Sequence, residues 1–94
     1  MPITREVLDG TTHVAIDGEL TIYTVADLAA ALLPEMVASP RVQLNLSQVT
    51  EMDGAGVQLL AVVHREASAG GTALTLSEQS QAVRQALQLC RCLV

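Results

Sequence analysis

The chain of 94 residues contains no lysine, tryptophan or phenylalanine, and Tyr23 is its only aromatic residue. Its five basic residues are all arginines, scattered along the sequence, and its net charge at pH 7 is −5. Nucleic-acid binding relies on clustered positive charge for the phosphates and on aromatic rings that stack on bases. Because both are scarce, we expect no nucleic-acid partner. An acidic protein of this kind more readily meets proteins with basic surfaces.

The absence of lysine also excludes a Walker-type phosphate loop, which ends in Lys-Ser or Lys-Thr. The segment Gly54-Ala55-Gly56 is predicted to open a helix, where free N–H groups attract anions. Asp53 directly precedes it and would repel a phosphate. We therefore expect no nucleotide or other cofactor.

Catalytic side chains are also sparse. His64 is predicted on the inward side of a helix, where a core-edge histidine is the favoured interpretation, and His13 has no companion for catalysis. Glu51 and Asp53 form a carboxylate pair by spacing, which beside a helix start usually means a cap and a solvated side chain. The sequence therefore predicts no enzyme.

The two cysteines, Cys90 and Cys92, lie near the end of the sequence. A metal site would need further ligands, which the distant histidines do not obviously supply, so we expect reduced thiols. Residues 1–6 lack a signal sequence, and the apolar stretch 25–37 is broken by Asp27, Pro34 and Glu35 and is too short to cross a bilayer. We expect one cytoplasmic domain over residues 1–94, without membrane insertion.

Hydrophobic periodicity predicts alternating strands and helices. Residues 3–8 and 13–16 form a hairpin around Asp9-Gly10, a dipeptide suited to turns with positive φ. Thr24 is expected to cap a helix that Pro34 kinks or restarts. The remaining predicted elements are a strand at 42–46, a helix from about 54 to 69 that stops at Gly70-Gly71, a strand at 72–76, and a last helix capped by Ser80.

This order, β-β-α-β-α-β-α, predicts a small α/β domain. Helices that follow strands through short links require parallel crossovers, and the opening hairpin is antiparallel, so the sheet is mixed. We expect about four to five strands packed with three to four helices. Because strand 42–46 alternates apolar and polar residues, one face of the sheet is expected to be less covered than the other.

The junction between this strand and the next helix is the most informative segment of the chain. Asp53 is predicted to cap the helix, and Gly54 and Gly56 leave the first turn open to an approaching molecule. Placed at 100° intervals, the outward side of the helix carries Gln58, Ala61, Val62, Arg65 and Glu66. An ordinary exposed face is one interpretation, and a docking surface for another protein is the one we favour.

An ordered set of motifs resembles the STAS domain, and in particular the bacterial anti-sigma factor antagonists. The set comprises Gly18-Glu19-Leu20, then Asn45-Leu46-Ser47 with Val49 and Met52-Asp53, then Gly56-Val57 with Leu59-Leu60, and finally Val83-Arg84 with Leu87 and Leu89. The resemblance covers nearly the whole chain. It implies a small mixed sheet with packed helices, and partner switching in which the antagonist binds an anti-sigma kinase and is turned off by phosphorylation.

The chain departs from the family at the phosphorylation site. The family typically has Asp, two Ser or Thr residues and Gly at this junction, with the phosphate on the hydroxyl before the glycine; here those two places hold Gly54 and Ala55. Many antagonists also carry an aspartate after Gly-Glu-Leu, where this chain has Thr21. The switch therefore cannot operate at Ala55, the position equivalent to the phosphoacceptor.

We therefore expect a constitutive signalling adaptor. The resemblance leaves the partner open between an anti-sigma or other kinase-like protein, a chemotaxis-type signalling protein, and, as the alternative function, the ATPase of a lipid-transport ABC complex. The expected partner-binding residues are Thr21, Tyr23, Asp53, Gly54, Ala55, Gln58, Ala61, Val62 and Arg65.

Overall fold

The computed structural model describes residues 3–89. Its elements are β1 (Ile3–Leu8), β2 (Thr11–Leu20), α1 (Val25–Leu32), α2 (Glu35–Ala38), β3 (Arg41–Met52), α3 (Gly54–Ala69), β4 (Ala73–Gln79) and α4 (Gln81–Leu89). The strands form one sheet in the order β1-β2-β3-β4. The β1–β2 pair is antiparallel and the other two pairs are parallel, which confirms the predicted mixed sheet and element order.

The opening hairpin turns at Asp9 and Gly10, which have φ angles of 52° and 77°. Two successive positive φ angles suit the tight turns that match the twist of antiparallel strands. Asp9 is the only non-glycine residue with positive φ among the described residues. The predicted turn is therefore confirmed.

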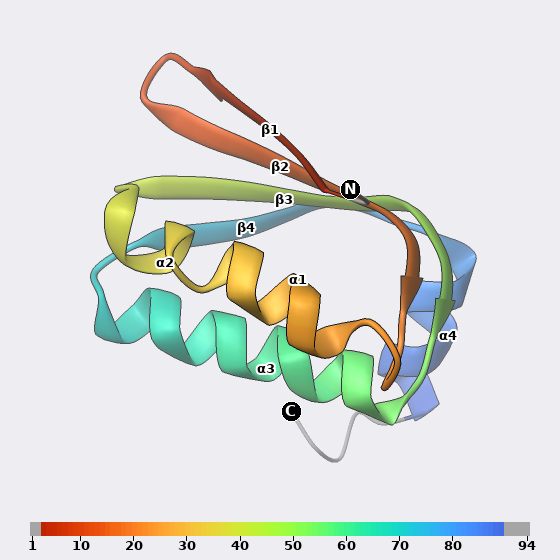
Figure 1. Cartoon of the computed structure of the whole chain (residues 1–94). Helices are drawn as coiled ribbons and strands as arrows, with labels where there is room; N and C mark the ends of the chain where they lie inside the picture. Colours follow the sequence, from red (N-terminus) through yellow and green to blue (C-terminus); the bar gives the residue numbers. More distant parts are fainter. Residues whose placement is uncertain (1–2, 90–94) are drawn as a thin grey trace.

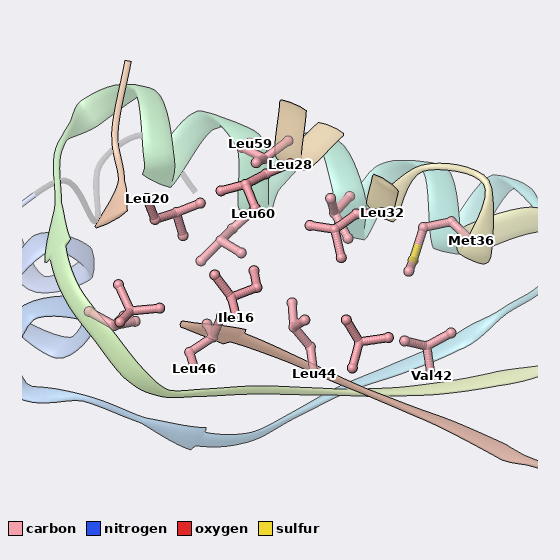
Figure 2. Close-up of a cluster of buried hydrophobic side chains, with 14 of the residues drawn as sticks. Ile16, Leu20, Leu28, Leu32, Met36, Val42, Leu44, Leu46, Leu59 and Leu60 are labelled. Carbon is pink, nitrogen blue, oxygen red and sulfur yellow. The ribbon is translucent and has the colours of Figure 1, made fainter. Parts of the chain in front are cut away.

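The helices α1, α2 and α3 pack against one face of the sheet, and α4 packs at its end (Figure 1). Alternate residues of the central strands, such as Val14, Ile16 and Leu44, are buried on this face. Figure 2 shows Ile16 and Leu44 facing side chains of α1 and α3, including Leu28 and Leu60. The opposite face carries partly exposed polar residues, as the alternation in the sequence predicts.

Three strands extend further than predicted. β2 continues to Leu20, β3 to Met52 and β4 to Gln79. Gly18 lies at an irregularity in the β2–β3 pairing and has a φ of 102°, which only glycine adopts easily. The strand bends there, as bulged strands do, and its end reaches the first turn of α3 (Figure 1).

The helix boundaries agree closely with the expectations. Pro34 separates α1 from α2, α3 ends at Ala69, and Gly71 beyond it has a φ of 76°. Ser80 caps α4 through its hydroxyl oxygen, which accepts from the Val83 N–H at 3.2 Å. No helix in the described part of the chain combines the length and apolar character needed to span a membrane.

Candidate functional site

Asp53 fixes the junction between β3 and α3. One carboxylate oxygen accepts from the Gly56 N–H at 3.1 Å, which is the N-cap bond predicted from the sequence. The other accepts from the Ile22 N–H at 3.0 Å. The Ile22 hydrogen bond is the largest of several causes that hold the Asp53 pKa below its ordinary value. A charged Asp53 therefore ties the loop after β2 to the start of α3.

The loop after β2 is held by its own threonines. The Thr24 hydroxyl donates to the Glu19 carbonyl at 2.9 Å and accepts from the Thr21 N–H at 3.0 Å. Thr24 lies at the N-cap position of α1, but its side chain makes no capping bond to the helix, so the predicted cap is wrong. Its hydroxyl is engaged within the loop, which also includes a hydrogen bond from the Tyr23 N–H to the Thr21 hydroxyl.

The two glycines of the first turn have different surroundings. A Cβ at Gly56 would overlap the Leu20 carbonyl oxygen and lie 3.0 Å from Cγ of Met52. Gly56 is buried, so the expectation that it leaves the turn open to an approaching molecule is wrong. Its missing side chain instead allows α3 to pack closely against the end of β2. Gly54 is exposed, and a Cβ there would meet nothing within 4 Å.

Two apolar residues of the loop are strongly exposed beside this turn. Ile22 is 64 % exposed and Tyr23 is 89 % exposed. A hollow of about 430 Å³ beside Tyr23 is lined in part by Glu19, Glu51 and Asp53. Glu51 is exposed to solvent, as the sequence predicted. The partner-binding residues expected from the sequence include Tyr23 but not Ile22. The available signal for Ile22 was its apolar side chain in a predicted loop.

The predicted outward residues of α3 do form a surface. Gln58 and Arg65 are exposed, and Ala55, Ala61 and Val62 are partly buried. Gly54, Gln58, Ala61 and Arg65 recur at helical spacing, so they share one stripe that begins at the first turn. Thr21 does not belong to an open surface, because it is only 7 % exposed, and its hydroxyl hydrogen bonds to Glu19 and Tyr23.

His64 is exposed, so its predicted inward position is wrong. The buried residues of α3 are Gly56, Val57, Leu59, Leu60, Val63 and Ala67, and α3 contacts α1 and α2 as well as the sheet. His64 follows Val57 by seven residues and Leu60 by four, so helical spacing placed it on the buried side, although its side chain is exposed. The helical pattern was correct, but the sequence does not show that helices as well as strands would cover α3.

The metal and thiol predictions concern different parts of the chain. Within residues 3–89, no group of three or more His, Cys, Asp or Glu side chains is placed to hold a metal ion. Cys90 and Cys92 lie outside the described residues. The junction therefore offers a hydrogen-bonded turn, two exposed apolar side chains and an acidic hollow, which together suit contact with another molecule.

One family model covers all of the residues that the structure describes. The family model described as "Mlab, STAS domain" matches residues 3–92. No curated protein sequence matches the chain.

Solved structures with the same fold include anti-sigma factor antagonists. One from Mycobacterium paratuberculosis has a TM-score of 0.81 at 24% identity, covering 96% of this chain and 77% of its own. SpoIIAA in its unphosphorylated form has a TM-score of 0.75 at 23% identity, covering 95% and 80%. The phosphorylated form of the Bacillus cell fate determinant SpoIIAA has a TM-score of 0.72 at 24% identity, covering 94% and 82%.

Proposed function

Because the chain belongs to the STAS domain family, we propose that it is a protein-interaction module of the anti-sigma factor antagonist type. It acts as a cytoplasmic signalling adaptor and performs no catalysis itself. Its partner is an anti-sigma or other kinase-like signalling protein, or a component of chemotaxis-type regulation. The docking face combines Ile22 and Tyr23 of the loop after β2 with the first turn and the outer stripe of α3.

The exposed apolar pair beside the first turn of α3 is the observation that carries this proposal. Ile22 and Tyr23 are presented to solvent on a loop that is fixed to α3 through Asp53. Apolar side chains held in a defined geometry lose little conformational freedom on binding, and aromatic residues are common anchors in protein interfaces. The face is therefore preorganised for a protein surface.

Ala55 gives this face one permanent charge state. SpoIIAA has been solved both unphosphorylated and phosphorylated, and a phosphate adds nearly two negative charges at neutral pH. Ala55 occupies the place equivalent to the family's phosphoacceptor and has no hydroxyl. We infer that binding of this module is controlled by its abundance or by its partner.

Placing a permanent negative charge at position 55 tests the docking face. The partner is first identified by mass spectrometry of proteins retained by the tagged module from its own cell extract, and its affinity is then measured with purified components. Ala55→Glu should weaken binding at least about 100-fold, because a charge becomes desolvated at the interface. The fold should survive, since a carboxylate is favourable in the first turn of a helix.

Ala69→Glu is the matched control, because it makes the same change at an exposed position of the same helix. It lies about 21 Å along the helix axis from Ala55, and should leave the affinity unchanged. Equal affinity of the native module and Ala55→Glu, with both folded by circular dichroism, would count against this docking face.

A second candidate function is that of an accessory subunit of a lipid-transport ABC complex. The description of the matched family model gives the name Mlab and does not mention anti-sigma factor antagonists. It therefore supports a second candidate partner, one that takes no part in the control of sigma factors. In this case the retained partner is a nucleotide-hydrolysing subunit within a membrane complex. A soluble kinase-like partner supports the signalling function instead.

A further inference from the structure

An apolar groove runs between α3 and β4, and two of its lining residues, Ala61 and Arg65, also belong to the outer stripe of α3. Its volume is about 710 Å³, within the range of about 300–1,000 Å³ typical of small-molecule sites. Leu74 and Leu76 of β4 form one wall and Leu87 of α4 forms another. The two elements α3 and β4 follow each other in the chain and lie along the same edge of the sheet (Figure 1).

Part of this apolar surface is open to solvent. Leu76 is 37 % exposed, and Leu74 and Leu87 are partly exposed, whereas Leu44 and Leu60 below them are buried in the core. A hollow lined mainly by leucine side chains leaves apolar area in contact with water. It would be stabilised by an aliphatic ligand.

Among the described residues that line the groove, Arg65 is the only Lys, Arg, Asp or Glu. Arg65, His64 and Ser68 of α3 contribute to its lining, and none of the described residues that line it is acidic. The whole chain has ten acidic residues and only five basic ones, so this local balance is opposite to that of the protein. The guanidinium of Arg65 suits a carboxylate, to which it can donate two parallel hydrogen bonds.

We propose that this groove binds a single-chain aliphatic carboxylate, such as a fatty acid. The hydrocarbon chain lies against the leucines, and the carboxylate lies at Arg65, with His64 and Ser68 beside it. Each methylene that enters the groove should tighten binding by about fourfold. Binding is reversible and involves no covalent step.

Isothermal titration calorimetry with octanoate, decanoate and dodecanoate, each below its micelle-forming concentration, tests the apolar part. Affinity should rise by about fourfold per methylene until the groove is full. Leu76→Gln should weaken dodecanoate binding by about tenfold or more, because it places a polar group on the wall. Val37→Gln changes an apolar residue that is 68 % exposed on α2 and outside the groove, and should have no effect.

The charged end is tested by comparing dodecanoate with its methyl ester. Arg65→Gln should weaken binding of the carboxylate by about tenfold and leave binding of the ester unchanged. Arg84→Gln, an exposed arginine outside the groove lining, should affect neither ligand. The proposal would be overturned if octanoate, decanoate and dodecanoate bound with equal affinity, or if Arg65→Gln and Arg84→Gln weakened dodecanoate binding equally. Binding of apolar peptides but of no fatty acid would also overturn it.

The groove shares Ala61 and Arg65 with the outer stripe of α3, but variants outside this overlap test the two proposals separately. Ala55 does not line the groove, so Ala55→Glu should retain dodecanoate affinity even where it abolishes partner binding. Leu76 belongs to β4 and not to the docking face, so Leu76→Gln should retain partner affinity. Loss of dodecanoate binding in Ala55→Glu would contradict the placement of the ligand in the groove between α3 and β4.

Discussion

The first turn of α3 has an inner side packed on the end of β2 and an outer side that faces solvent. Gly56 lies on the inner side, where the Leu20 carbonyl leaves no room for a side chain. Gly54 lies on the outer side with open space around it. Two glycines separated by a single residue therefore serve different ends, close packing in one case and an accessible backbone in the other.

This difference predicts that stability and recognition depend on different sides of one turn. The inner side packs on the end of β2. The Asp53 carboxylate holds the following loop in place, because it accepts hydrogen bonds from the backbone N–H groups of both Ile22 and Gly56. The outer side then presents Gly54, Ala55 and the exposed loop residues together. Changes on the inner side should act on folding, whereas changes on the outer side should act on binding.

Gly56→Ala should produce the largest loss of stability. The added methyl overlaps a backbone oxygen, which cannot rotate away as a flexible side chain does. Overpacking of this kind lowers the free energy of unfolding by about 3 kcal/mol, which for a domain of this size lowers Tm by more than about 10 °C. Urea denaturation followed by circular dichroism measures the change.

Gly70→Ala provides a comparison at another crowded glycine, where a Cβ would lie 2.7 Å from the Met36 carbonyl oxygen. Both variants should be destabilised, but only Gly56→Ala should also disturb the loop that carries Tyr23. An unfolding midpoint for Gly56→Ala equal to that of the native protein would show that the end of β2 can move away without cost.

Local signals in the sequence predicted the helices well. The Asp53 cap, the break at Pro34 and the Ser80 cap each depend on residues close together in the chain, and the structure contains all three. The turn at Asp9-Gly10 was predicted for the same reason. The helical projection predicted a docking surface, and the family resemblance added the expected class of partner and the position of Ala55 as the phosphoacceptor equivalent.

Features that depend on distant segments were missed or misplaced. The extension of β3 through polar residues to Met52 comes from pairing with β2, which strand propensity does not show. The role of Gly56 depends on Leu20, and His64 is exposed although helical spacing places it with buried Val57 and Leu60. Each error arises where a second element decides what a local pattern means.

Asp53→Asn should destabilise the protein less than Gly56→Ala, in a pH-dependent way. The carboxylate accepts two backbone hydrogen bonds, and an asparagine side chain has only one acceptor oxygen. The folded pKa of Asp53 is lowered, so its stabilisation is fully present above the unfolded pKa of about 3.9 and is lost as pH falls through the folded value.

Paired urea denaturations of the native protein and Asp53→Asn at neutral and strongly acidic pH measure this effect. The stability difference should be largest at neutral pH and should shrink as pH falls below the unfolded pKa. Amide hydrogen exchange should also quicken at Ile22 and Gly56 in the variant, because both N–H groups lose an ionised acceptor. A difference that is constant with pH would mean that the charge on Asp53 does not matter.

Gly54→Ala should change stability least and distinguish the two sides of the turn most sharply. The methyl meets no neighbour, and replacing glycine by alanine in a helix raises the free energy of unfolding by about 0.5 kcal/mol. If the outer side packs closely on a partner, the same methyl should weaken binding by about tenfold. A variant that is more stable but binds less tightly would show that Gly54 is required for recognition and not for folding, whereas unchanged affinity would place the partner's contacts on the loop and further along α3.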